Sequence, residues 1–301
     1  MSGSQPDHRF LATLALVAGI VCIGFSAIFV KLAGAAGVPG PVSAFYRVLI
    51  SAAVILPWWL ARRGPRPSGR DLGLIVAGGA FFALDLALWN TSLLRTSAAT
   101  ATLLANNSPL WVGLGTLLLF RERLARRYWL GLALALAGMA VLVGGDAFRR
   151  LDLGAGNLLA LTASFFYAGY LLTTQRARAR VAVVDFMAIS CLSCTLLLLL
   201  VNLGLGSRLS GFPARAWLDL VGLGLITQFG GWLAINFALG HLRAAPVSVA
   251  LLAQTVVTAL VAIPVLGEPI HPNQVLGGFT VLIGIALVTR SGDPGKAKAA
   301  E

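Results

Sequence analysis

Long apolar segments, each separated from the next by a short polar stretch, follow one another along almost the whole chain. A helix needs about 20 predominantly apolar residues to cross the hydrocarbon core of a bilayer. Ten segments meet this requirement, with expected boundaries at residues 10–32, 41–60, 72–94, 97–120, 128–145, 154–175, 183–204, 216–239, 244–267 and 273–290. The pattern therefore predicts an all-α polytopic membrane protein with ten transmembrane helices.

The second half of the chain repeats the first. A shift of 146 residues aligns residues 90–138 with residues 236–284 without a gap. Four polar or glycine positions then coincide, namely Asn90 with Asn236, Glu122 with Glu268, Gly131 with Gly277 and Gly138 with Gly284. Because a unit of five crossings ends on the side opposite to its start, a second such unit runs in the opposite sense. The sequence therefore predicts two inverted five-helix repeats, at residues 1–148 and 149–301.

Composition excludes an ordinary soluble protein. Hydrophobic residues make up 58% of the chain and charged residues 11%, whereas soluble domains contain about 25% charged residues. The connections between the segments are short and leave little room for a soluble catalytic domain, so any function must reside in the bundle, within the lipid bilayer. The net charge of +12 does not indicate a nucleic-acid partner, because the basic residues lie in the connecting loops.

The basic residues are unequally shared between the two sides of the predicted bundle. The side that holds both termini carries sixteen: Arg9, Arg62, Arg63, Arg66, Arg70, Arg121, Arg123, Arg126, Arg127, Arg176, Arg178, Arg180, Arg243, Arg290, Lys296 and Lys298. The opposite side carries six: Lys31, Arg95, Arg149, Arg150, Arg208 and Arg215. Cytoplasmic loops are enriched in Lys and Arg, so both termini are predicted to be cytoplasmic.

Several short motifs occur in a fixed order, and some occur in both halves. They are Gly24 to Lys31, Pro41, Phe45-Tyr46-Arg47, Thr96-Ser97-Ala98-Ala99, Pro109, Phe120-Arg121-Glu122-Arg123-Leu124, Ala244-Ala245-Pro246 and Leu266-Gly267-Glu268-Pro269. Together they resemble the EamA-type members of the drug/metabolite transporter superfamily across nearly the whole chain. Within that family the chain looks most like the YddG-type bacterial exporters of aromatic and other apolar amino acids. The resemblance implies export across the bacterial cytoplasmic (inner) membrane.

Two stripes of residues, each ending in an asparagine, occupy equivalent positions of the two repeats. Polar groups inside a bilayer usually face the interior of the bundle, and a spacing of four places residues on one face of a helix. The stripes are Phe82, Leu86 and Asn90 in the third segment and Gln228, Trp232 and Asn236 in the eighth. They are predicted to line a central substrate site. An alternative role for the two asparagines is to join helices by hydrogen bonds.

The fourth segment contains a polar interruption near its middle, at residues 106–109. A proline inside a helix removes a backbone donor and clashes with the preceding turn, and discontinuous helices often form transporter sites. Asn106, Asn107 and Pro109 are therefore candidate substrate-binding residues, together with Gln254 of the ninth segment. A structural kink capped by the asparagine side chains explains the same residues. Because the second copy lacks the proline, the site is expected to be asymmetric.

Four further intramembrane residues carry candidate chemistry. Tyr167 and Tyr170 share a face of the sixth segment and suit a partly apolar ligand, although tyrosine is also common at membrane interfaces. Arg47 and Asp85 are candidate coupling or gating residues. Arg47 would bind a substrate carboxylate, or else support helix ends through backbone carbonyls. Asp85 would carry a proton, or else be permanently protonated and hydrogen-bonded.

The chemistry of the predicted interior narrows the cargo. Phosphorylated substrates require several basic residues, cationic drugs require acidic ones, and the bundle offers only Arg47 and Asp85. The sequence therefore predicts a secondary transporter that exports a small neutral hydrophobic or aromatic amino acid, or a similar metabolite, by alternating access between inverted repeats. The alternative is an exporter of hydrophobic drugs or cations, or a lipid flippase. No enzyme activity is expected, because no catalytic set lies at one depth, and no cofactor or metal is predicted.

Overall fold

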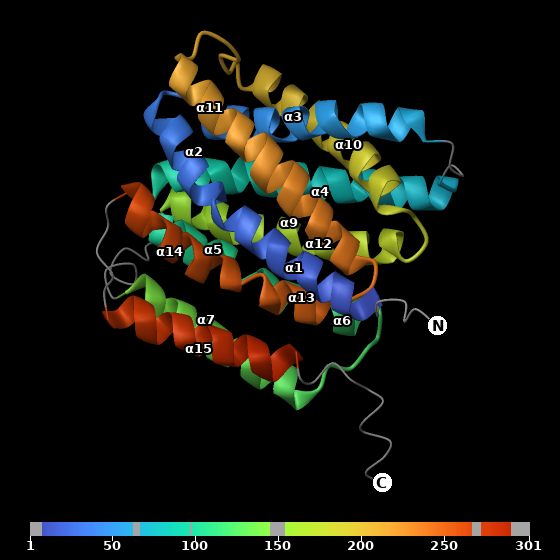
Figure 1. The fold of residues 1–301 in the computed structure, drawn as a ribbon, viewed down its shortest axis with the longest axis vertical. Coiled ribbons are helices and arrows are strands. Elements are labelled where there is room, and N and C mark those ends of the chain that lie inside the picture. Colours follow the sequence, from blue (N-terminus) through green and yellow to red (C-terminus); the bar gives the residue numbers. More distant parts are fainter. Residues whose placement is uncertain (1–7, 63–66, 97, 145–153, 267–271, 290–301) are drawn as a thin grey trace, which may run out of the picture.

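The chain folds as a bundle of helices (Figure 1). The computed structural model describes residues 8–62, 67–96, 98–144, 154–266 and 272–289, and every regular element within these ranges is helical. The elements are α1 (His8–Gly24), α2 (Ser26–Ala35), α3 (Gly40–Ala61), α4 (Gly69–Arg95), α5 (Ala98–Ala105), α6 (Ser108–Leu119), α7 (Arg126–Val143), α9 (Ala155–Arg178), α10 (Val183–Gly204), α11 (Ala214–Gly222), the π-helix η1 (Leu223–Gly231), α12 (Trp232–Leu239), α13 (Ala244–Ala250), α14 (Ala253–Leu266) and α15 (Pro272–Thr289).

All ten predicted segments fold as helices, with boundaries within a few residues of those expected. Within the described ranges, nine helical stretches are long and apolar enough to cross a membrane. The fourth predicted segment is not among these nine. It is divided into α5 and α6 by a turn at Asn106 and Asn107, so neither piece alone reaches the length of a bilayer crossing.

Some expectations lie outside the described residues. These are the boundary between the repeats at 148/149, Glu268 in the repeat alignment, and the basic residues Arg63, Arg66, Arg149, Arg150, Arg290, Lys296 and Lys298.

Two other predicted segments are also interrupted. The first segment breaks at Phe25, between α1 and α2, and the ninth breaks between α13 and α14 at Leu251 and Leu252. The breaks at residues 106–107 and 251–252 occupy nearly the same place in the repeat alignment. Pro109 follows the first of these breaks, whereas the equivalent position after the second is Thr255. The backbone is therefore interrupted in both copies, although only one has a proline at this position.

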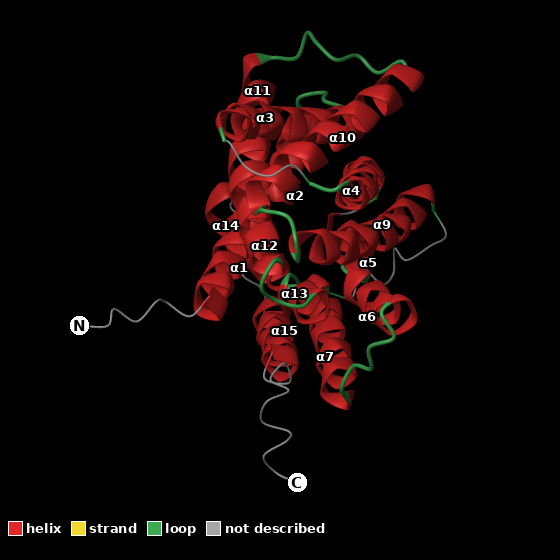
Figure 2. Cartoon of the chain, turned by 90° about the vertical axis from the view of Figure 1, so that its right-hand side faces the viewer, coloured by secondary structure: helices red, strands yellow, loops and turns green. Residues whose placement is uncertain are grey.

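Helices from the two halves of the chain are interleaved. In the centre, α4 packs along α9 and α10, while α1 packs along η1 and α12. The pair α7 and α15 lies side by side at one end of the molecule, away from α3 and α11 (Figures 1 and 2). The centre of the bundle is therefore built from segments far apart in the sequence.

The α7–α15 pair owes its closeness to glycine. A Cβ atom added to Gly138 would lie 2.9 Å from the backbone oxygen of Gly277, and one added to Gly131 would lie 2.7 Å from that of Gly284. These separations leave no space for a side chain, so the two backbones approach each other directly. The recurrence of glycine in both repeats thus serves close helix packing, as small residues commonly do in membranes.

The distribution of polarity is that of a membrane bundle. Large apolar side chains such as Leu118 (72%) and Phe279 (65%) are exposed on the outer surface. Polar side chains such as Asn90, Thr174 and Asn236 are completely buried. Exposed apolar side chains on this scale are compatible with a lipid environment, and polar groups inside it are directed to the interior.

Candidate functional site

A central cavity of about 70 Å³ lies between the two halves of the chain. The lining residues are Ile23, Ser26, Ala27, Arg47, Phe82, Asp85, Leu86, Trp89, Thr102, Ala105, Asn106, Tyr167, Trp232, Gln254 and Thr258. On α3 and α4 they lie toward the end of the bundle at which α3 begins and α4 ends. A cavity of this volume holds about five water molecules.

One face of α4 supplies four of the fifteen lining residues, more than any other helix. Phe82, Asp85, Leu86 and Trp89 line the cavity, and their spacing of three, four and seven residues is that of a single helix face. Asn90 does not line it. Its Nδ2 donates to the Ser43 hydroxyl at 2.8 Å, so it joins α4 to α3. A run of residues spaced by four drifts around a helix with 3.6 residues per turn, which turns Asn90 away from the site.

Aromatic rings close one end of the cavity. Phe82 stacks on Tyr170 with ring centroids 4.3 Å apart, and the edge of Trp232 meets Phe82 at 4.8 Å and Tyr170 at 5.2 Å. Tyr167 adds a second edge contact to Trp232 at 5.8 Å. Phe82, Tyr167 and Trp232 line the cavity, whereas Tyr170 lies beneath them. We refer to these four residues as the aromatic floor.

A buried polar cluster supports the floor from below. The Tyr170 hydroxyl donates to Oδ1 of Asn236 at 3.0 Å, and Nδ2 of Asn236 contacts Sδ of Met187 at 2.8 Å. The guanidinium of Arg178 donates to the backbone oxygen of Asn236 at 2.9 Å and to that of Val181. Tyr170 and Asn236 therefore join α9, α10 and α12 behind the cavity wall and do not face the cavity.

Arg47 projects from α3 into the cavity and is held there by two neighbours. Its Nε donates to Oε1 of Gln228 at 2.9 Å, and its Nη1 donates to the Ser26 hydroxyl at 2.8 Å. Gln228 belongs to the π-helical stretch of the eighth segment, in which i→i+5 hydrogen bonds replace the usual ladder. The altered register directs Gln228 toward α3, so it orients Arg47 rather than lining the cavity.

Asp85 lines the same cavity and is 8% exposed. No hydrogen bond joins its carboxyl group to another part of the described chain. Its oxygens also lie beyond the 4.0 Å of a direct ion pair with Arg47. Burial of a carboxyl group without a hydrogen-bond partner costs free energy. A hydrogen-bond donor in the cavity would offset this cost.

The interrupted helices meet the cavity at Asn106 and Gln254. Nδ2 of Asn106 donates to the backbone oxygen of Thr102 at 2.8 Å, while its Oδ1 accepts from Nε2 of Gln254 at 3.3 Å. The Asn107 side chain does not line the cavity and caps carbonyls of Leu103 and Leu104 at 3.2 and 3.0 Å. Asn106 therefore combines a capping role with a place in the wall, and it links the two halves across the site.

Pro109 lies in the first turn of α6, behind the cavity wall. A helix tolerates proline at this position, because the missing N–H has no intrahelical acceptor there. Its backbone oxygen accepts a hydrogen bond from the Tyr128 hydroxyl at 2.7 Å. Pro109 thus begins a new helix and connects it to α7.

Sequence reasoning missed several lining residues. Trp89 was detectable, because it lies seven positions after Phe82 and four after Asp85 on the same face of α4. Ser26 and Ala27 follow the break between α1 and α2, where the backbone oxygen of Gly24 accepts from the Thr258 hydroxyl at 2.7 Å. No proline or polar run marks this break, so its place at the cavity depends on contacts with α14.

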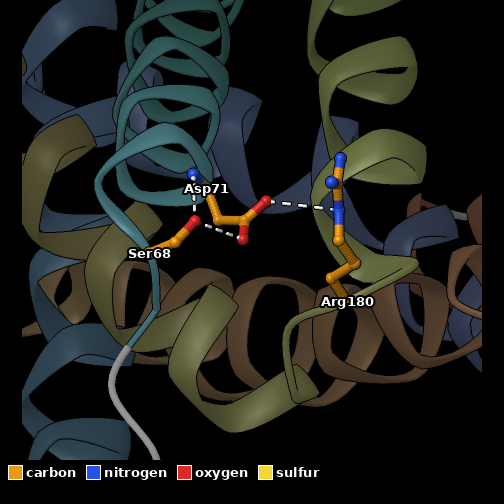
Figure 3. Close-up of polar contacts among 3 residues, drawn as sticks. All are labelled: Ser68, Asp71 and Arg180. Carbon is orange, nitrogen blue, oxygen red and sulfur yellow. Dashed lines mark hydrogen bonds and ion pairs between the residues drawn. The ribbon is translucent and has the colours of Figure 1, made fainter.

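Two ion pairs cross between the halves at the end of the bundle where α4 begins. Arg180 lies 3.5 Å from Asp71, and Arg243 lies 3.7 Å from Glu122. Ser68 fixes Asp71 by accepting from its backbone N–H at 3.2 Å and donating to its carboxylate at 2.6 Å (Figure 3). The aromatic floor lies between these ion pairs and the cavity, so the site is closed toward this end.

The chain is similar to several known transporters. YwfM of Bacillus subtilis, an uncharacterized transporter, is 29% identical over 284 residues, which cover 90% of each protein. A probable terminal-alkyne amino-acid exporter of Streptantibioticus cattleyicolor is 28% identical over 226 residues, or 75% of each protein. A solved crystal structure superposes with a TM-score of 0.76 over 93% of this chain and 97% of the other, at 23% identity, which supports the fold alone.

The family comparison covers both halves. The model of the EamA-like transporter family matches the chain twice, over residues 10–144 and residues 154–290. These two matches include almost all of the described helices and every residue that lines the central cavity. A multi-pass helical bundle with a cavity between two family units is the architecture of a transporter. The chain belongs to the EamA-like transporter family.

Proposed function

We propose that the protein exports a small neutral amino acid with a hydrophobic or aromatic side chain across the bacterial cytoplasmic membrane by alternating access. The observation that carries the proposal is the composition of the central cavity. It combines aromatic walls with one basic residue, Arg47, one acidic residue, Asp85, and a few hydroxyl and amide groups. A zwitterion with an apolar side chain complements such a surface in both charge and polarity.

Other cargo classes fit the cavity less well. A phosphorylated metabolite carries several negative charges and is usually bound by several basic groups. Among the described residues, Arg47 is the one basic residue that lines the site. The probable terminal-alkyne amino-acid exporter of Streptantibioticus cattleyicolor adds support from a relative of similar length, and with it the expected direction of transport.

Helix packing supports two inverted repeats, divided near residues 148 and 149. In the repeat alignment, α4 is equivalent to α12 and α9 is equivalent to α1. The contact of α4 with α9 therefore has its counterpart in the contact of α1 with α12. The contact of α4 with α10 likewise has its counterpart in that of η1 with α3. With α5 and α6 together as one further crossing, the described chain has ten crossings, five in each half. Because five is odd, the second half then crosses the membrane in the opposite sense to the first.

The basic loops would place both termini in the cytoplasm. In that orientation the end closed by the aromatic floor and the two ion pairs is the cytoplasmic end, and the cavity lies toward the outside. The cargo would therefore enter only after the two halves separate at the cytoplasmic end, as alternating access requires.

The alternative is an exporter of hydrophobic drugs or cations, or a lipid flippase. Asp85, without a partner in the described chain, and the rings of Trp89 and Trp232 favour a hydrophobic cation, because aromatic faces and carboxylates both attract positive charge. Against this alternative, Arg47 lines the same small cavity and would repel such a ligand.

Transport by the purified protein in liposomes tests the proposal. Labelled phenylalanine and tryptophan should enter protein-containing vesicles faster than protein-free vesicles. Unlabelled neutral amino acids should compete, whereas hydrophobic cations and phosphorylated metabolites should not. If hydrophobic cations competed and neutral amino acids did not, the alternative would replace the proposal.

A further inference from the structure

Two opposite charges face one small cavity. Arg47 projects from α3 and Asp85 from the neighbouring helix α4, and 3% and 8% of these residues are exposed. They are near enough to interact electrostatically, yet their charged atoms lie beyond the 4.0 Å of a direct ion pair. Two buried charges usually form a close pair when geometry allows it. Here both residues line the cavity without forming such a pair.

The surroundings of Arg47 hold it apart from Asp85. Ser26 and Gln228 accept from Nη1 and Nε, so the guanidinium is fixed from two sides. No hydrogen bond from Nη2 to any described residue is formed, and a guanidinium has five N–H donors in a rigid plane. Arg47 therefore keeps donors available for a carboxylate while its position is set by protein contacts.

The carboxyl group of Asp85 is the second charged group in the cavity wall. This group accepts no hydrogen bond from any described residue, although Asp85 is more than nine-tenths buried. An unpaired buried carboxylate is stabilised strongly by a cationic donor. Phe82, Trp89 and Trp232 adjoin it in the wall, and the Trp232 indole N–H is a buried donor that also has no partner in the described chain.

We infer that Asp85 and Arg47 bind the two charged groups of one zwitterionic amino acid: Asp85 receives the α-ammonium group and Arg47 the α-carboxylate. This inference rests on the proposed transport of amino acids and adds the residues that determine specificity. The side chain of the cargo lies against the aromatic floor. A ligand that lacks either charged group leaves one buried charge without a partner, so the cavity selects against both amines and carboxylic acids.

Three ligands that differ in their charged groups test the inference. L-phenylalanine has both groups, 3-phenylpropionate lacks the ammonium, and 2-phenylethylamine lacks the carboxylate. Binding to the purified full-length protein is measured from the ligand-dependent rise of the unfolding midpoint, which requires no transport. The wild-type protein should bind phenylalanine about tenfold or more tightly than either analogue, because each analogue loses a charge-assisted hydrogen bond.

The two variants should change different preferences. Asp85→Asn should abolish most of the preference for phenylalanine over 3-phenylpropionate and retain the preference over 2-phenylethylamine. Arg47→Gln should do the reverse. Arg47→Lys is the second variant if Arg47→Gln does not fold: a lysine keeps the charge but lacks the planar fork, so the preference over 2-phenylethylamine should fall by a smaller factor. The control Arg70→Gln removes a charge from an exposed position outside the cavity and should leave both preferences intact.

A purely structural role has a different signature. If both charge variants weakened the binding of all three ligands equally, the ratios of their affinities would not change. That result would overturn the assignment of the two charged groups, while the proposed amino-acid transport would stand. If the folded wild-type protein bound neither phenylalanine nor any other neutral amino acid, the proposed function would fail, and this inference would fail with it.

Discussion

At the scale of single residues, the position of a side chain around its helix decides whether it reaches the cavity. Among the residues expected at the site, Arg47, Phe82, Asp85, Leu86, Asn106, Tyr167, Trp232 and Gln254 line the cavity. The others expected there are Asn90, Asn107, Pro109, Tyr170, Gln228 and Asn236, and they hold the surrounding helices together. The sequence singled out all of these residues, but it did not show the division between the two groups.

Trp232 and Asn90 illustrate this division in a testable way. Trp232→Ala removes a ring from the aromatic floor and should raise the KM for phenylalanine about tenfold, because a well-packed aromatic contact is lost. Asn90→Ala removes one hydrogen bond to Ser43 and should lower the free energy of unfolding by about 1 kcal/mol without changing KM. Transport kinetics in liposomes and unfolding in detergent measure the two effects. An equal rise of KM in both variants would contradict this division.

At the scale of elements, the bundle depends on where its helices are interrupted and on how closely they pack. The turn at residues 106–107 precedes a proline, whereas the breaks at Phe25 and at residues 251–252 have no such signal. At the Phe25 break, the backbone oxygen of Gly24 accepts from the Thr258 hydroxyl of α14. At the second break, the backbone oxygen of Leu252 accepts from the Thr255 hydroxyl of the same segment. The sequence located these helices within a few residues and indicated the interruption at residues 106–109, but it did not show the other two breaks.

The α7–α15 contact gives a prediction for element packing. Gly138→Ala places a Cβ atom 2.6 Å from the backbone nitrogen of Val281, so the two helices must separate. The free energy of unfolding should fall by about 1 to 3 kcal/mol. Substrate affinity should not change, because neither helix lines the cavity. The matched control is Gly73→Ala, whose added Cβ meets nothing within 4 Å. Thermal unfolding in detergent distinguishes them, and equal midpoints for the two variants would refute the packing role.

At the scale of the whole molecule, the two halves meet through polar contacts at the closed end. Arg180 pairs with Asp71, and Arg243 pairs with Glu122, so each pair includes one residue from each half. The arginines are largely exposed. Exposed pairs contribute about 0 to 1 kcal/mol each. Contacts of this strength can break without loss of the fold, as the proposed alternating access requires at this end.

Removal of one pair should expose the interior of the closed end. Arg180→Gln leaves the contacts of Ser68 with Asp71 in place and should open this end about two- to fivefold more often. A cysteine at the fully buried Thr174 reports the opening through its reaction with a membrane-impermeant thiol reagent. The background for this measurement replaces Cys22, Cys191 and Cys194 by serine.

Arg70→Gln is the matched control for this measurement, because it removes the same charge from an exposed position at the start of α4. It should leave the rate of labelling unchanged. Equal labelling rates in the Arg180 variant and the unsubstituted background would show that the ion pair does not hold this end closed.

The sequence by itself determined the helices, their approximate ends, the membrane environment and the family. These properties depend on local quantities: the length of an apolar segment, and the need of every backbone group in a bilayer for an intrahelical partner. The tertiary structure alone decided which polar residues share the cavity, where the first and ninth predicted segments break, and that Asp85 faces Arg47 without pairing with it. Those features depend on the rotation and approach of helices far apart in the chain, which no local pattern specifies.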